Sequence, residues 1–134
     1  AIVAREGRDV TLIGSGIMVS RCLAAAGELA AGGIQARVLD LHTIKPLDEE
    51  TVLAACRETG AIVTAEEHSI VGGLGGAVAE LVADRHPVPV KRVGLADRFA
   101  ETGPYADLLD RYGMAAADIV KAAQAALAAK ERVG

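Results

Sequence analysis

The sequence predicts an α/β fold: a five-stranded, mostly parallel sheet with helices on both faces and one antiparallel strand at an edge. Strand-like apolar runs alternate with helical patterns of about 10–15 residues, as in proteins whose parallel strands are joined by right-handed crossovers. The composition, 51% hydrophobic and 24% charged, supplies enough apolar side chains for a buried core. At 134 residues, the chain is expected to form a single domain over residues 1–134.

The first two strands are predicted to form a hairpin. Residues 2–5 and residues 10–13 are rich in apolar and β-branched side chains, and the second run is apolar enough to be buried on both faces. The connection at residues 6–9 is too short for a crossover. The first strand is therefore expected to be antiparallel and to lie at an edge of the sheet.

The next elements alternate between helix and strand. Residues 18–31 carry apolar side chains at spacings of three and four, which predicts a helix, and residues 36–41 form the next strand. Asp48 is placed to cap the N-terminus of a second helix, and Gly60 is placed to end it.

The second half of the chain continues this alternation. Its expected elements are a strand at residues 61–65, a glycine-rich turn at 72–76, a helix at 77–85, a strand at 90–93, and helical stretches at about 105–111 and 115–130. The resulting order of elements predicts helices that cover both faces of the sheet.

Composition and charge exclude several classes of function. The net charge is −4 and only 2% of residues are aromatic, so no nucleic-acid partner is expected. No apolar run reaches the roughly 18 residues of a membrane span, and the charged N-terminus does not resemble a signal peptide, so a cytoplasmic protein without a membrane partner is expected. Because the sequence begins without Met, we expect it to be a piece of a longer protein.

The two cysteines do not suggest a metal site. Cys22 and Cys56 lie within helical patterns and form no CxxC pair, and the three histidines have no metal-ligand spacing with them. Both cysteines are expected to be small buried side chains in a reduced protein.

Two polar segments follow predicted strands in the first half. Gly14, Ser15 and Gly16 stand before a helix N-terminus, where backbone N–H groups can bind an anion. The segment lacks the third glycine of a dinucleotide fingerprint and the lysine of a phosphate loop, so a tight turn without a ligand is the favoured interpretation. His42, close to Asp40, is weak evidence for acid–base chemistry and is more simply a polar loop residue.

The most unusual polar cluster follows the strand at residues 61–65. Paired carboxylates beside a histidine can tune a pKa for acid–base chemistry, but no nucleophile, metal ligand or second base accompanies them. Glycines allow another backbone to approach closely, which favours a contact between domains. The candidate interface loop consists of Glu66, Glu67, His68, Gly72, Gly73, Gly75 and Gly76. Phe99 is expected to be either a core residue or an interface anchor.

Five segments, in order along nearly the whole chain, resemble the C-terminal domain of the transketolase family of thiamine-diphosphate enzymes. They are REGRDVTLI (residues 5–13), VLDLHTIKPLD (38–48), AEEHSIVGGLGGAVAE (65–80), PVPVKRVG (87–94) and LLDRYGM (108–114). The sequence of the third segment is most similar to that of transketolase itself, notably the short split-subunit type.

The resemblance implies a role for the whole enzyme, in the pentose phosphate pathway: transfer of a two-carbon ketol unit between ketose and aldose phosphates with thiamine diphosphate and Mg²⁺. In this family the cofactor is bound by a GDG…N motif and an activating glutamate in other domains, and this sequence contains no GDG. The resemblance therefore implies no catalytic, cofactor-binding or metal-binding residue in this chain. It implies partners within the same enzyme, either other domains or a second subunit, and a homodimeric parent.

Other interpretations stay open. The same kind of domain occurs in 1-deoxy-D-xylulose-5-phosphate synthase and in the beta chain of 2-oxoacid dehydrogenases, where it can dock a partner acyltransferase. A stand-alone nucleotide- or flavin-binding module is supported only by Gly14, Ser15 and Gly16.

Overall fold

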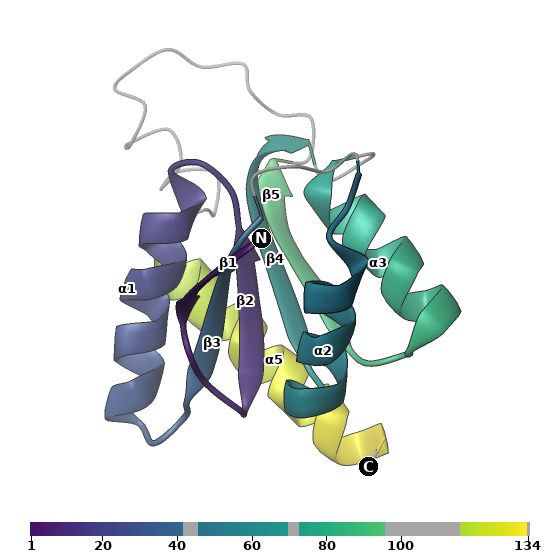
Figure 1. Cartoon of the computed structure of the whole chain (residues 1–134). Coiled ribbons are helices and arrows are strands. Elements are labelled where there is room, and N and C mark those ends of the chain that lie inside the picture. The colour runs from purple at the N-terminus through teal and green to yellow at the C-terminus, as the bar shows by residue number, and fades with distance from the viewer. Residues whose placement is uncertain (42–45, 70–72, 96–115, 134) are drawn as a thin grey trace.

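The computed structural model describes residues 1–41, 46–69, 73–95 and 116–133. Its elements, in chain order, are β1 (Ile2–Arg5), β2 (Val10–Gly14), α1 (Met18–Ala31), β3 (Ala36–Asp40), α2 (Glu49–Thr59), β4 (Ile62–Ser69), α3 (Leu74–Arg85), β5 (Val90–Leu95) and α5 (Ala116–Val133). The strands form one five-stranded sheet in the order β1-β3-β2-β4-β5. Helices α1 and α5 cover one face and α2 and α3 cover the other (Figure 1). None of the described helices is long and apolar enough to cross a bilayer.

The sheet is mixed, as the sequence predicts. Strands β2, β3, β4 and β5 are parallel to one another, and β1, at an edge, runs antiparallel to β3. The predicted α/β class and the antiparallel edge strand are both confirmed.

The predicted hairpin between the first two strands is wrong, because β3 lies between β1 and β2. The connection at residues 6–9 crosses the start of β3, where Gly7 packs so closely on the backbone of Ala36 and Arg37 that a Cβ would not fit. The Arg37 guanidinium holds this crossing by donating from Nε to the Gly7 carbonyl oxygen at 3.1 Å. The arrangement buries β3 between two strands instead of leaving it at the edge.

Two hydrophobic clusters lie on opposite faces of the sheet because neighbouring strand residues point to opposite sides. Leu12 packs in the cluster under α1 and α5, and the next residue, Ile13, packs in the cluster under α2 and α3. The first cluster is rich in alanine and includes Ala25, Ala26, Ala123 and Ala126. These small side chains let α1 and α5 pack closely on each other and on the sheet.

Several element boundaries differ from the predicted ones. Strand β4 continues through Ser69 and α3 begins at Leu74, so the glutamate–histidine segment is strand and two of the glycines are helical. The caps of α2 are as predicted: Asp48 accepts a hydrogen bond from the Thr51 N–H at 3.2 Å, and Gly60 ends the helix at φ 72°. The expected helical stretch at about 105–111 lies outside the described residues.

Candidate functional site

The carboxyl ends of β2, β3, β4 and β5 meet at one edge of the sheet because these strands are parallel (Figure 1). Open α/β sheets usually bind ligands at this edge. It brings together the turn at residues 14–16, Asp40 and the end of β4, three segments that the sequence singles out. His42 and Phe99 lie outside the described residues.

Glu66 is buried, with 3% of its surface exposed, and caps the N-terminus of α3. Its Oε2 accepts a hydrogen bond from the Leu74 N–H at 2.6 Å, and its Oε1 accepts one from the Gly75 N–H at 2.9 Å. A carboxylate in this position satisfies two unpaired helix donors and faces the positive end of the helix dipole. Glu66 thus lies in β4 and caps a helix of its own chain, and its part in a contact between domains stays a prediction.

Two of the candidate glycines are required by contacts within the chain. A Cβ at Gly73 would overlap the Glu66 carboxylate. A Cβ at Gly75 would lie 3.0 Å from both Thr64 Oγ1 and Arg92 Cδ, closer than ordinary contact allows. The backbone approaches the chain's own side chains at these positions. Gly76 has open space, and Gly72 lies outside the described residues.

Thr64 shows how tightly this corner is packed. Its hydroxyl oxygen is buried and has no hydrogen-bond partner within the described part of the chain. The first turn of α3 covers it at Gly75. We expect this close packing to hold the start of α3 firmly against β4.

The backbone of Glu67 and His68 lies in β4, next to Glu66. The structure describes no side chain at either position. Their role in contacts between domains therefore stays a prediction.

The turn at residues 14–16 is built for packing between a strand and a helix. A Cβ at Gly14 would lie 3.1 Å from Cys22 Sγ, so glycine allows α1 to approach β2. The first amides of α1 are engaged within the turn: the Met18 N–H donates to the Ser15 carbonyl at 3.1 Å, and the Val19 N–H donates to the Gly16 carbonyl at 3.2 Å. These bonds hold the tight turn between β2 and α1.

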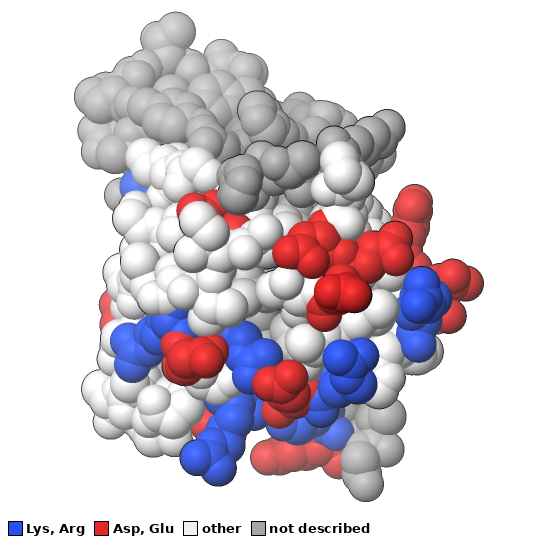
Figure 2. Space-filling model, viewed as in Figure 1, with Lys and Arg blue, Asp and Glu red and all other residues white. Residues whose placement is uncertain are grey.

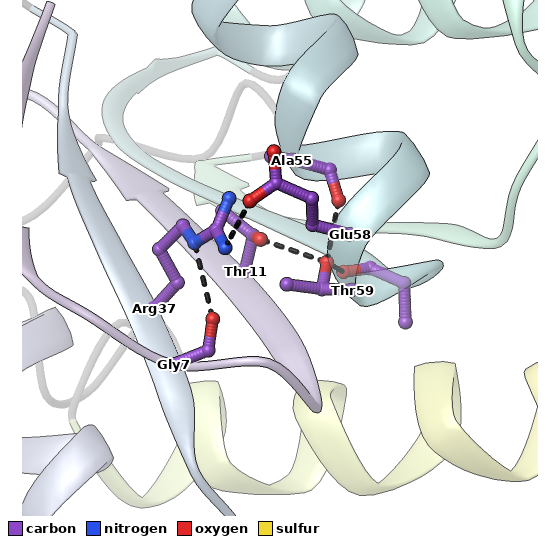
Figure 3. A network of polar contacts seen from close by, with 7 residues as sticks. Gly7, Thr11, Arg37, Ala55, Glu58 and Thr59 are labelled. Carbon is purple, nitrogen blue, oxygen red and sulfur yellow. Dashed lines mark hydrogen bonds and ion pairs between the residues drawn. The ribbon is translucent and has the colours of Figure 1, made fainter.

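A polar network lies near the amino ends of β2 and β3, at the other end of the strands (Figure 3). The hydroxyl groups of Thr11 and Thr59 lie 2.8 Å apart, and Thr59 also donates to the Ala55 carbonyl. Beside them, Arg37 forms an ion pair with Glu58 at 2.9 Å. The network joins β2, β3 and α2.

Lys130 extends these contacts to the C-terminal helix. Its Nζ donates to the Thr59 carbonyl oxygen at 2.7 Å, so a cation from α5 lies at the C-terminal end of α2. Sequence reasoning did not find this contact because the two residues are far apart in the chain. These threonine and lysine contacts join elements of the fold and are structural.

Neither thiol is suited to nucleophilic chemistry. Burial raises the pKa of Cys22 to about 12, and burial also raises the pKa of Cys56. Both thiols are therefore protonated at neutral pH. Among the described residues, no three His, Cys, Asp or Glu side chains are grouped so that they could hold a metal ion.

Comparisons with known proteins show where this architecture belongs. The family model described as "Transketolase, C-terminal domain" matches residues 1–119. The chain belongs to this transketolase family. Membership explains why the five sequence segments occur together and why the sheet carries an antiparallel edge strand.

Relatives within the transketolase family include subunits and longer enzymes. The chain is 51% identical over 123 residues to the 6-deoxy-6-sulfo-D-fructose transketolase subunit SqwH of Clostridium sp. (strain MSTE9), covering 92% of this chain and 38% of that protein. It is 48% identical over 130 residues to 1-deoxy-D-xylulose-5-phosphate synthase 1 of Geobacter sulfurreducens, covering 96% of this chain and 20% of the synthase.

A solved structure of a transketolase has the same fold. It is described as a split gene transketolase, inactive beta4 tetramer, and matches with a TM-score of 0.92 and 50% identity over 96% of this chain and 42% of that one. The chain thus spans less than half the length of these relatives.

Proposed function

We propose that this chain is the C-terminal part of an enzyme that transfers a two-carbon ketol unit between ketose and aldose phosphates. The observation that carries the proposal is the family match together with about 50% identity to two transketolase proteins, one named as a subunit and one as a split-gene product. In the proposed enzyme this chain is non-catalytic and contributes to domain packing and dimer assembly in the cytoplasm.

Thiamine diphosphate and Mg²⁺ would belong to the other parts of that enzyme. The described residues do not fit a diphosphate. The N-terminus of α3 is already filled by the Glu66 carboxylate, which would repel a phosphate, and the first amides of α1 bond to their own turn. We therefore propose that this chain alone binds neither group, and we derive no chemical step through them.

The activity assay compares the chain alone with the chain mixed with a transketolase-type subunit that supplies the cofactor-binding domains. Ketol transfer between sugar phosphates should occur only in the mixture and should saturate at a fixed ratio of the two proteins. Transfer by the chain alone would contradict the non-catalytic role.

A second candidate is the equivalent domain of a 1-deoxy-D-xylulose-5-phosphate synthase. The similarity to the Geobacter sulfurreducens enzyme, at 48% identity over 96% of this chain, favours it specifically. The two candidates differ in the partner that restores activity: a synthase domain should restore formation of 1-deoxy-D-xylulose 5-phosphate when it is mixed with the remaining domains of such a synthase, and should not restore ketol transfer with the transketolase-type subunit.

A further inference from the structure

The N-terminus of α3 binds an anion that belongs to the chain itself. The N–H groups of Leu74 and Gly75 donate to the two oxygens of the buried Glu66 carboxylate, at 2.6 Å and 2.9 Å. Gly73, at the cap position, offers no side chain to the helix, and the first turn of α3 contains no acidic residue. Among the described residues, Glu66 is thus the anion that faces the positive end of this helix.

A further polar group beside this helix end is left unused. The Thr64 hydroxyl oxygen has no hydrogen-bond partner within the described part of the chain, although the residue is only 1% exposed. Thr64 and Glu66 are two residues apart in β4 and therefore point to the same face of the sheet. Both also meet Gly75, since Glu66 accepts from its N–H and a Cβ there would lie 3.0 Å from Thr64 Oγ1.

The unused hydroxyl indicates an anion larger than a carboxylate. Buried hydroxyl groups nearly always have a hydrogen-bond partner, so the exception needs a physical reason. Both Glu66 oxygens are engaged by N–H groups of α3. A phosphate has further oxygens, and one of them would accept a hydrogen bond from Thr64 while two others take the N–H groups.

A positive charge borders the same corner. Arg92 lies opposite Thr64 on the neighbouring strand β5. Its Cδ would be 3.0 Å from a Cβ at Gly75, and the guanidinium begins at the next atom of the side chain. Backbone N–H groups at a helix start, a hydroxyl group and an arginine are the groups with which proteins usually bind phosphate.

We propose that the N-terminus of α3 is a phosphate-binding site that the Glu66 carboxylate fills from within, as an autoinhibitory contact. The carboxylate occupies both N–H groups, and its charge repels a phosphate, so the site is closed while Glu66 is in place. The contact keeps phosphorylated molecules away from the edge of the sheet where open α/β folds usually bind ligands. This inference does not depend on ketol transfer, since it concerns what one helix end binds.

The exposed surface beside α3 has the opposite preference. Figure 2 shows acidic side chains gathered over α2 and α3. Glu49, Glu80 and Asp84 line the groove between these helices together with Arg85, so the charge of the groove is net negative. Such a surface disfavours phosphate. Phosphate binding that depends on position 66 can therefore be assigned to the helix end.

The test titrates the 134-residue chain with inorganic phosphate by calorimetry, against sodium chloride of the same ionic strength. Glu66→Ala removes the carboxylate and leaves the N–H groups in place. A double variant, Glu66→Ala with Thr64→Val, also removes the unused hydroxyl. Glu80→Ala removes a carboxylate from the exposed side of α3 and is the control.

We expect saturable phosphate binding by Glu66→Ala and none by the wild type or by Glu80→Ala. The dissociation constant should be about tenfold higher in the double variant, because a hydrogen bond to a charged group is lost. Phosphate should also raise the melting temperature of Glu66→Ala more than that of the control, which reports the general effect of the salt. If Glu66→Ala is unfolded in the absence of phosphate, phosphate should refold it, as followed by circular dichroism.

The proposal is overturned if Glu66→Ala neither binds phosphate nor gains more stability from it than the control. Equal affinities of the single and double variants would also overturn it, because Thr64 would then not belong to the site. Phosphate binding by the wild type would show that Glu66 does not close the site. Binding of acetate but not of phosphate by Glu66→Ala would show that the site fits a carboxylate only, which also contradicts the proposal.

Discussion

Glu66 connects the end of β4 to the start of α3. It is a buried carboxylate whose two oxygens are both used by backbone donors of one helix end. From sequence, its position after an apolar run marks it as polar and unusual, but nothing local shows which way the side chain points. Its helix-capping role depends on the start of α3 at Leu74.

Replacing Glu66 by Gln should lower the free energy of unfolding by about 1–3 kcal/mol, because the amide nitrogen would face a backbone N–H that then lacks an acceptor. Urea denaturation measures the change. Glu80→Gln, at an exposed position on α3, is the control and should have little effect. Equal effects of the two substitutions would show that the cap is not stabilising.

Gly73 and Gly76 offer a matched pair of Gly→Ala changes. Ala at position 73 would press on the Glu66 carboxylate and should destabilise by about 1–3 kcal/mol. Ala at position 76 meets open space within a helix and should stabilise by about 0.5–1 kcal/mol. In a Glu66→Ala background the cost at position 73 should fall, and a cost that stays the same would contradict the contact.

We predict that the buried Cys22 thiol lowers the free energy of unfolding at alkaline pH. Its pKa is raised by burial from 9.0 to about 12, so the folded state keeps the proton after the unfolded chain has lost it. The stability from this group is complete below pH 9 and falls as the pH rises from about 9 toward 12. Urea denaturation at pH 8 and pH 10 should show a smaller decrease in Cys22→Ala than in the wild type. Identical decreases would exclude the thiol as a cause.

Helices and strands with a strong local pattern could be predicted from the sequence. The order of the strands in the sheet could not. Helix α1 was predicted with both boundaries correct, because its apolar spacing and the glycines after it are local signals. The place of β3 between β1 and β2 depends on the contacts of Gly7 with β3 and on burial of β3 from both sides, and no local pattern reports these.

Lys130 of α5 bonds to the C-terminal end of α2 and also donates to the Asp9 carbonyl oxygen at 3.4 Å. Lys130→Met keeps the apolar stem and removes the Nζ that bonds to the Thr59 carbonyl. We expect a loss of about 1 kcal/mol in the free energy of unfolding. Lys121→Met, at an exposed position of α5, is the control. Hydrogen exchange of the last turn of α2 should also increase in the first variant only.

At the scale of the whole molecule, the fold class and the family could be predicted from the sequence because both depend on patterns spread over the chain. The candidate site was harder to predict. Gly73 and Gly75 lie close to the side chains of Glu66, Thr64 and Arg92, which the fold brings together from β4 and β5, and no local pattern in the sequence indicates these contacts.

We propose that this chain is a non-catalytic part of a transketolase-type enzyme, and calorimetric titration with the cofactor provides the decisive test. The 134-residue chain is titrated with thiamine diphosphate in the presence of Mg²⁺. We predict no saturable heat of binding, because the helix N-terminus at α3 is filled by Glu66 and the first amides of α1 are bonded to their own turn. Saturable binding with a micromolar or lower dissociation constant would contradict the claim.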